Sequence, residues 1–326
     1  MNKKILVTGA NGFVGANLCN YLYEKGYDFS CMVRNNADIS LIRKDIIDKI
    51  VYCDYTNHFQ VASIVSEYHT IIHLAALTKA KYFDDFYDVN VKLTESIVQI
   101  MDETKHCKHL IYISSQAALG PSLGKTKLKE RYIGKPISWY GISKNLAEQK
   151  VRASKKKWTI IRPASVYGEG DKDFLTYFKM INKHISPIPG SNTKYISLVY
   201  VQDLVKLIEK CIYNINVRNR VFHAADDNIY TIEEFIYSLT QVMDKKCVAF
   251  RVPDKAIIKV ATFLDYLNEN KKKQPLLNKQ KAREITQESW LIECYQTMKT
   301  LGFEITSSLE ENLKNTYLWY KEHKYI

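Results

Sequence analysis

Tyr140 and Lys144 are residues whose types and spacing could do chemistry. A spacing of four places both side chains on one face of a helix, one turn apart. A tyrosine hydroxyl is a poor base at neutral pH because its reference pKa is about 10. A nearby ammonium lowers that pKa, so the pair could exchange a proton with an alcohol or ketone. Because the chain holds 23 tyrosines, such a match arises readily by chance and needs support from other motifs.

Three glycines near the N-terminus have the spacing of a phosphate-binding turn. Gly9, Gly12 and Gly15 follow an apolar run at 4–8 and precede an amphipathic helical pattern. Gly9 permits a tight turn, Gly12 lets the backbone approach a pyrophosphate, and Gly15 lets the helix pack on the strand. The helix N-terminus supplies N–H groups and a positive dipole to the phosphates. The context predicts a dinucleotide site, and the alternative is an ordinary glycine turn.

The end of the second apolar run indicates which dinucleotide would bind. In folds that bind a dinucleotide at such a turn, an acidic residue about 20 residues beyond the glycines bonds a ribose 2′-hydroxyl. The sequence has Arg34 there, and a cation suits a 2′-phosphate. The expected cofactor is therefore NADP(H), with NAD(H) left open. The alternative is that Arg34 is a solvated residue at a strand end.

The elements that must position these residues alternate along the first half of the chain. Apolar, β-branched runs predict strands at 4–8, 29–33, 50–52, 70–75, 110–114 and 159–162, with helical patterns between them. Strands separated by helices predict an α/β fold with a Rossmann-type doubly wound parallel sheet. We expect a cofactor-binding domain at 1–165 and a smaller, mixed α/β substrate region at 166–326, partly packed back onto it. A turn is expected at 187–190 and an exposed basic segment at 268–283.

Further motifs join these into a family resemblance. The run HLIYISSQAALG ends a strand at Ser114 and Ser115, at the sheet edge where open α/β folds bind ligands. With the glycines, Tyr140 and Lys144, this pattern resembles the extended short-chain dehydrogenase/reductase family over nearly the whole chain. Other matches are Asp54 in YCDYTN, HLAA at 73–76, Asn90 in DVNV, RPASVYGEGD at 162–171 and VYVQDLV at 199–205.

The resemblance implies a hydride-transfer mechanism. In that family the serine five residues before the glycine that closes the loop is catalytic, which corresponds to Ser115 before Gly120. A nicotinamide would give or take hydride, Tyr140 would give or take the hydroxyl proton, and Ser115 would orient the oxygen. Lys144 would hold the cofactor ribose and lower the pKa of Tyr140. No metal is expected.

The resemblance also implies which residues contact the cofactor. The implied set is Gly9, Asn11, Gly12, Phe13, Val14, Gly15, Arg34, Asp54, Tyr55, Leu74, Ala75, Ala76, Asn90, Tyr140, Lys144, Pro163 and Val166. Two of the matching positions also have plain structural readings. His73 could be a buried, hydrogen-bonded core histidine, and Asn90 a capping or turn residue.

Departures from the family pattern indicate the branch. Dehydratases carry an Asp-Glu pair where this chain has Gln116 and Ala117, which argues against dehydration. Nucleotide-sugar epimerases commonly have an arginine and an asparagine where this chain has Ile196 and Ser165, although Lys194 or a basic residue elsewhere could replace the arginine. Other segments most resemble the dihydroflavonol-reductase-like and 3β-hydroxysteroid-dehydrogenase-like branch. The leading expectation is an NADP(H)-dependent reductase or dehydrogenase acting on a ketone or secondary alcohol. The alternative is a nucleotide-sugar epimerase or ketoreductase.

The charge balance of the chain indicates which partners it could bind. Lys and Arg number 47 against 35 Asp and Glu, a net charge of +12, but no helix-turn-helix, zinc finger or aromatic-basic motif accompanies it, so no nucleic acid is expected. Biased composition explains most of the excess. A basic loop at 116–138 could draw in an anionic substrate, or could simply be solvated. Seven scattered cysteines suit reduced thiols, and no membrane span is evident. We expect a cytoplasmic protein, and the resemblance implies a homodimer through helices containing 90–101 and 140–154.

Overall fold

A seven-stranded parallel sheet organises the N-terminal half of the molecule. The computed structural model describes residues 4–269, 275–305 and 307–326. The strand order is β11-β6-β5-β4-β1-β2-β3, and every neighbouring pair is parallel. The strands are β1 (Ile5–Thr8), β2 (Phe29–Arg34), β3 (Ile50–Cys53), β4 (Thr70–His73), β5 (His109–Ile113), β6 (Lys157–Pro163) and β11 (Arg220–Ala224). The predicted doubly wound parallel sheet is confirmed, and its central strands are buried because helices cover both faces.

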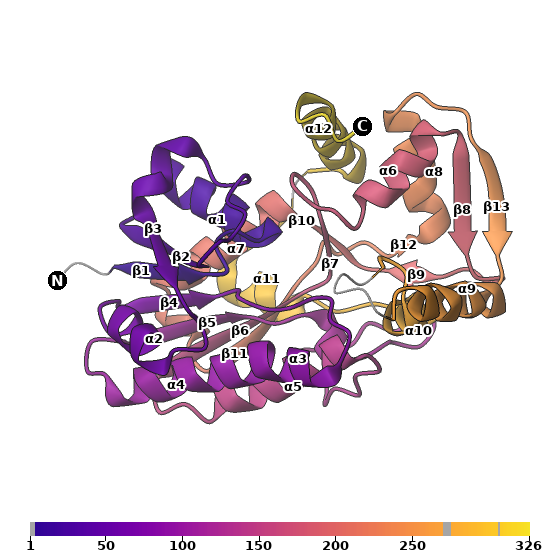
Figure 1. Cartoon of the computed structure of the whole chain (residues 1–326). Helices are drawn as coiled ribbons and strands as arrows, with labels where there is room; N and C mark the ends of the chain where they lie inside the picture. Colours follow the sequence, from indigo (N-terminus) through magenta and orange to yellow (C-terminus); the bar gives the residue numbers. More distant parts are fainter. Residues whose placement is uncertain (1–3, 270–274, 306) are drawn as a thin grey trace.

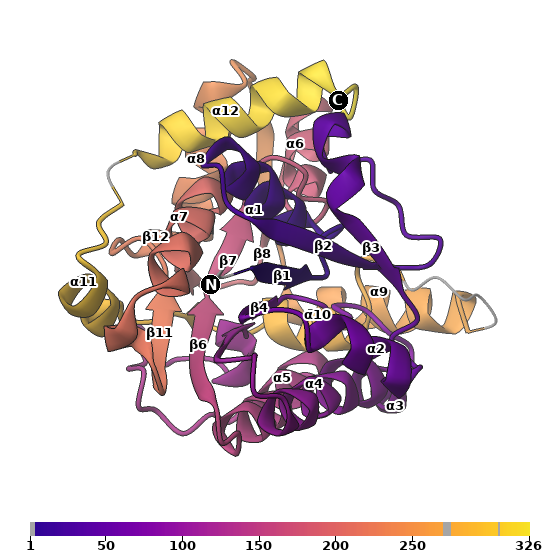
Figure 2. The ribbon, with the colours of Figure 1, turned by 90° about the vertical axis from the view of Figure 1, so that its left-hand side faces the viewer.

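Two helical layers enclose this sheet. Helices α1 (Phe13–Glu24) and α7 (Val201–Ile212) lie on one face, and α2 (His58–Val65), α4 (Leu93–Glu103) and α5 (Trp139–Arg152) lie on the other (Figures 1 and 2). The short α3 (Phe83–Phe86) and a π-helical turn, η2 (Tyr87–Lys92), lead into α4. Two apolar clusters fill the two sides of the sheet. Although α7 and β11 follow residue 165 in the chain, both join this layered body, and the division at residue 165 stays a prediction.

The remaining elements form a smaller mixed α/β region beside the carboxyl edge of the sheet (Figure 1). A third apolar cluster joins α6 (Leu175–Asn182), α8 (Ile232–Val242) and α12 (Leu309–Glu322). The short strands are β7 (Ser165–Tyr167), β8 (Ile185–Pro189), β9 (Tyr195–Ile196), β10 (Leu198–Tyr200), β12 (Tyr230–Thr231), β13 (Val248–Val252) and β14 (Ser289–Trp290). Helices α9 (Asp254–Leu267) and α10 (Lys279–Ile285) pack on each other, and α11 (Tyr295–Leu301) packs beside β11. Among the described residues, no helix has the length and apolar character needed to cross a bilayer.

One local expectation is wrong, and a second holds only in part. The segment expected to turn at 187–190 is mostly strand β8, which pairs in parallel with β13, and only Gly190 has a turn-like φ of 89°. Prolines are tolerated in β8 because the strand has a single neighbour. In the segment expected to be exposed at 268–283, Asn278 and Ala282 are buried because α10 packs on α9. Residues 270–274 lie outside the described residues.

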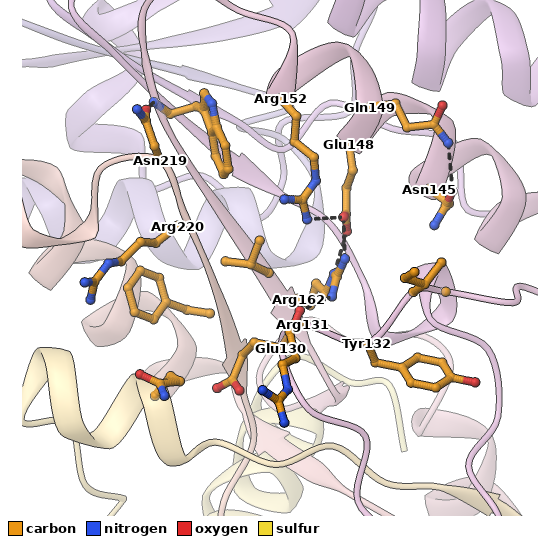
Figure 3. Close-up of a pocket in the computed structure, with 16 residues that line it drawn as sticks. Glu130, Arg131, Tyr132, Asn145, Glu148, Gln149, Arg152, Arg162, Asn219 and Arg220 are labelled. Carbon is orange, nitrogen blue, oxygen red and sulfur yellow. Dashed lines mark hydrogen bonds and ion pairs between the residues drawn. The ribbon is translucent and has the colours of Figure 1, made fainter.

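A buried ion pair fastens α5 to the sheet. The Glu148 carboxylate accepts hydrogen bonds from Arg162 Nε at 2.8 Å and Nη2 at 2.6 Å, and from the Ser114 hydroxyl at 2.7 Å (Figure 3). The Glu148 and Arg162 side chains are 3% and 4% exposed. Burial alone would raise the pKa of Glu148, but the hydrogen bonds and charge of Arg162 outweigh it and hold the pKa below its usual value. The pair therefore stays ionised at neutral pH.

Removing one partner of this pair should destabilise the fold strongly. We expect Arg162→Met to lower the free energy of unfolding by about 3–5 kcal/mol, because Glu148 would remain buried without its cation. Arg152→Met is the matched control, since Arg152 touches the same carboxylate at 3.4 Å but is 40% exposed, and its loss should cost at most about 1 kcal/mol. Urea denaturation of both variants measures the difference. Equal losses would contradict the assigned role of the buried pair.

Candidate active site

The carboxyl ends of β1, β4 and β5 and the first turn of α5 meet where the two parts of the molecule face each other (Figure 1). Ser138 caps α5 by accepting a hydrogen bond from the backbone N–H of Gly141. Tyr140 therefore lies in the first helical turn and Lys144 one turn later. Ser115 follows β5 and caps a short 3₁₀ turn, η3 (Gln116–Ala118), through the N–H of Ala117. The residues expected to be catalytic are thus brought together.

The Ser115 and Tyr140 side chains are neighbours at this edge of the sheet. Tyr140 is partly exposed, and its ring lies 6.5 Å from that of Phe86. Burial of the hydroxyl raises the pKa of Tyr140 to about 12, the Ser115 side chain lowers it, and the charge of Glu284 raises it. The phenol is therefore protonated at neutral pH and can donate a proton.

Lys144 is held beneath this hydroxyl pair. Its Nζ donates to the backbone oxygen of Ile113 at 2.7 Å and lies 4.2 Å from the centre of the Tyr112 ring. Burial lowers the pKa of Lys144 to about 7, while Glu148 raises it. Burial has the largest effect on the pKa of both Tyr140 and Lys144. That Lys144 lowers the Tyr140 pKa stays a prediction.

The glycine turn brings the N-terminus of α1 close to the same edge. Gly9 has a φ of 68°, and a Cβ there would meet the backbone of Ala75 at 2.6 Å. A Cβ on Gly15 would lie 2.2 Å from the carbonyl oxygen of Gly9. Gly12 is the N-cap residue of α1, and no side chain caps this end of the helix. The turn is therefore a backbone cradle beside uncapped N–H groups, which fits a bound pyrophosphate.

The residues expected near the adenosine half of the cofactor differ in their contacts. Arg34 is the exposed last residue of β2. Burial raises the pKa of the nearby Tyr55 to about 12, and the charge of Arg34 opposes this rise slightly. The Tyr55 hydroxyl donates to Met32 O at 2.9 Å and accepts from Gly9 N at 3.4 Å. Asp54 is exposed, and its carboxylate accepts from the N–H and hydroxyl of Thr56. Arg34 and Tyr55 thus border the glycine turn, whereas the Asp54 carboxylate is already engaged locally.

Asn90 and His73 are built into the framework. The Asn90 side chain accepts from Leu77 N, and its amide donates to Leu77 O and to the Ser143 hydroxyl of α5. His73 bonds the hydroxyls of Thr8 and Thr94, and burial lowers its pKa to about 3, so the ring is neutral. His73 matches its plain reading as a buried core histidine. Asn90 is neither a cap nor a turn residue, because it lies inside η2 and ties the loop after β4 to α5.

The other expected cofactor residues lie around the same edge. Leu74 follows β4 and bonds Thr8 O through its N–H, and the Ala75 backbone lies against Gly9. Asn11 donates to Asp38 O. The remaining residues lie at the start of α1, after β4, at the end of β6 and in β7: Phe13, Val14, Ala76, Pro163 and Val166.

Sequence reasoning missed the helix that faces the start of α5. In α10, Gln280 accepts from the backbone N–H of Trp139 at 3.0 Å, and Glu284 accepts from the Ser138 hydroxyl at 2.7 Å. Lys281 bonds Glu284 at 3.3 Å. These side chains form a wall beside Tyr140 from a segment more than 130 residues away in the chain. No local pattern marks them, because their role follows from tertiary packing alone.

Several basic side chains of the loop at 116–138 already have partners or line another pocket. Lys127 bonds Asp227 at 2.8 Å, and Lys125 lies over the Tyr195 ring. Arg131 helps to line a pocket of about 610 Å³ on the outer side of α5, together with Arg152 and Trp158 (Figure 3). Neither Tyr140 nor the glycine turn lines that pocket, which is therefore distinct from the candidate active site.

Comparisons with known proteins agree on the fold. The model of the NAD-dependent epimerase/dehydratase family matches residues 5–225. The chain is 25% identical over 289 residues to ceramide reductase of Caulobacter vibrioides, covering 88% of this chain and 85% of the relative. It is 31% identical over 265 residues to UDP-glucose 4-epimerase of Vibrio cholerae, covering 78% and 80%. The structure of UDP-glucuronic acid 4-epimerase from Bacillus cereus, in complex with UDP-glucuronic acid and NAD, superposes with a TM-score of 0.78 at 19% identity, covering 98% and 99%.

Two glycine substitutions should separate folding from cofactor binding. Gly15→Ala should destabilise the protein by about 1–3 kcal/mol, because its Cβ would overlap the Gly9 carbonyl. Gly12→Ala should fold nearly normally, since its φ of −74° is open to alanine and its Cβ would lie 3.3 Å from Gly9 O. That methyl should still weaken NADPH binding, because it projects at the phosphate cradle. Thermal unfolding and NADPH fluorescence titration measure the two effects. Wild-type affinity in Gly12→Ala would contradict this placement of the pyrophosphate.

Proposed function

Because the chain belongs to the NAD-dependent epimerase/dehydratase family, as its motifs predicted, we propose that it is an oxidoreductase that interconverts a ketone and a secondary alcohol with NADP(H). The observation that carries this proposal is that Ser115, Tyr140 and Lys144 come together at the same sheet edge as the glycine turn. The relative from Caulobacter vibrioides is a reductase, which supports ketone reduction.

Each of the three proposed catalytic residues has a distinct task. When bound, the nicotinamide cofactor supplies or accepts the hydride. In the reducing direction Tyr140, a neutral phenol at pH 7, donates its proton to the substrate oxygen. Ser115 donates a hydrogen bond to the same oxygen and orients it. Lys144, anchored on Ile113 O, holds the cofactor ribose beneath the pair.

One contact favours a reductase over a nucleotide-sugar enzyme. Lys194 was the residue that could replace the missing diphosphate arginine at Ile196. Its Nζ is buried and already bonds Thr286 O at 2.9 Å, Gln287 O at 3.2 Å and Asp254 at 3.2 Å. Ile196 itself lies in the third apolar cluster. Neither side chain is placed to clamp a diphosphate, so we favour a substrate without one.

The second candidate function is nucleotide-sugar epimerisation. It is supported by the 31% identity to the Vibrio cholerae UDP-glucose 4-epimerase. The same Ser115, Tyr140 and Lys144 would serve it, because epimerisation through a ketone passes hydride out of and back into one substrate. The two functions differ in whether the cofactor is consumed.

Three further properties complete the proposal. The substrate is a small molecule that can be anionic. We assign Lys281, in α10, as the cation that would contact it. The protein forms a homodimer through α4 and α5, which pack side by side. It works in the cytoplasm.

Turnover of a substrate panel tests the proposed reaction. We expect NADPH oxidation with ketones, and little with UDP- or GDP-keto sugars. Tyr140→Phe should retain cofactor binding but lower kcat by about 10²–10⁴-fold, because the proton donor is lost. Tyr132→Phe is the matched control, since Tyr132 lies in the outer loop that lines the separate pocket. Normal turnover in Tyr140→Phe would refute the role of Tyr140, and epimerisation without net NADPH consumption would favour the second function.

The cofactor preference depends on Arg34. Wild type should bind NADPH more tightly than NADH, because the guanidinium at the end of β2 can bond a 2′-phosphate. In Arg34→Ala that preference should shrink by about tenfold, with NADH affinity unchanged. Isothermal titration with both cofactors measures the ratio, and Arg43→Ala, which removes another exposed arginine, is the control. Equal preference in wild type and Arg34→Ala would rule out this assignment.

A further inference from the structure

Helix α9 exposes an unusual number of large apolar side chains. Of the 22 such exposed side chains among the described residues, six fall between positions 258 and 276: Ile258, Val260, Phe263, Tyr266, Leu267 and Leu276. Phe263 is 60% exposed and Tyr266 is 72% exposed. The helix runs along the outside of the smaller region, beside α10 (Figure 1). Only a narrow side is buried, at Ile257 and Ala261. Apolar side chains gathered in this way mark an interaction surface.

Positive charges share the exposed side of the helix. Lys259, Phe263 and Tyr266 follow at intervals of four and three and therefore lie on one face, with Lys255 one turn earlier. Lys255 and Lys259 are exposed and form no ion pair with another described residue.

The acidic side chains of α9 are turned away from this face. Asp254 pairs with the buried Lys194, and Asp265 accepts from the backbone N–H of Lys279 in α10. Both are partly buried. The outer face of α9 is therefore cationic and apolar, with no compensating carboxylate of its own.

The face lies close to the candidate active site. Helix α9 packs on α10, whose Gln280 and Glu284 bond the first residues of α5 beside Tyr140. Just beyond α9, the backbone oxygen of Glu269 accepts a hydrogen bond from Lys81, in the loop that follows β4. Only α10 therefore separates α9 from the start of α5 and Tyr140.

We propose that the outer face of α9 docks the protein on an anionic lipid bilayer. Aromatic and aliphatic side chains insert at the level of the headgroups, and Lys255 and Lys259 contact lipid phosphates, as in other helices that lie in the membrane interface. The helix lies on the bilayer and does not span it. The positive charge of the face favours an anionic lipid surface over a second copy of this chain, because the α9 face of that copy would carry the same positive charge.

Docking in this way has a consequence for the candidate active site. Because α9 packs on α10, and α10 bonds the start of α5, docking would bring Tyr140 within one helix of the docked face. The docking itself does not depend on the reaction proposed above, and it can be measured without any substrate.

Vesicle flotation of the full-length protein tests the proposal. Wild type should float with vesicles of phosphatidylcholine mixed with phosphatidylglycerol, and only weakly with phosphatidylcholine alone. The double variant Phe263→Ser/Tyr266→Ser should lose at least tenfold in vesicle affinity. Lys255→Gln and Lys259→Gln should each weaken binding about fivefold, and the pair together should flatten its salt dependence.

A matched double variant, Phe59→Ser/Ile133→Ser, removes two side chains that are 85% and 86% exposed elsewhere, and it should bind vesicles like wild type. Thermal unfolding confirms that each variant folds, which is expected because the changed residues face solvent. Absence of wild-type binding to the anionic vesicles, or equal binding by the α9 variants, would overturn the proposal. Sedimentation showing that Phe263→Ser/Tyr266→Ser converts a dimer to a monomer would also overturn it and assign the face to self-association.

Discussion

The candidate active site depends on how one face of α5 meets the end of β5. Tyr140, Lys144 and Glu148 recur every four residues, so they lie in a row on the helix. Each meets a different group at the end of the strand: the Ser115 hydroxyl, the Ile113 carbonyl and the Ser114 hydroxyl. The deepest contact is locked by the Glu148–Arg162 pair. A small rotation of α5 would break all three contacts together, so the ion pair fixes the position of the phenol from two turns away.

Burial controls the protonation of this row more than neighbouring charges do. It raises the pKa of Tyr140 to about 12 and lowers that of Lys144 to about 7. His73, behind the glycine turn, is lowered to about 3 by the same cause. Only Glu148 remains firmly charged, because Arg162 is hydrogen-bonded to it. The floor of the site therefore favours neutral groups, and a neutral phenol suits proton donation to a carbonyl oxygen.

The sequence predicted the features that local physics determines. The parallel sheet followed from strand and helix periodicity, and the glycine turn from backbone demands that the overlaps at Gly9 and Gly15 now explain. The Tyr140–Lys144 spacing placed both side chains correctly. What it could not supply were distant contacts. Spacing alone cannot tell how deeply Tyr140 and Lys144 are buried, and burial has the largest effect on both pKa values.

Long-range packing also explains why the basic segment at 268–283 is only partly exposed. Helix α10 has seven residues, too few to be stable alone, so it forms only where α9 covers one side and α5 the other. Its polar residues then become the cleft wall, with Gln280 and Glu284 bonded to the start of α5. Helix α9 uses its narrow buried side for this support, through Ile257 and Ala261, and leaves its broader apolar side outward. Helix α9 therefore supports α10, which lies beside Tyr140, and also carries the exposed apolar face. Only α10 separates that face from the start of α5.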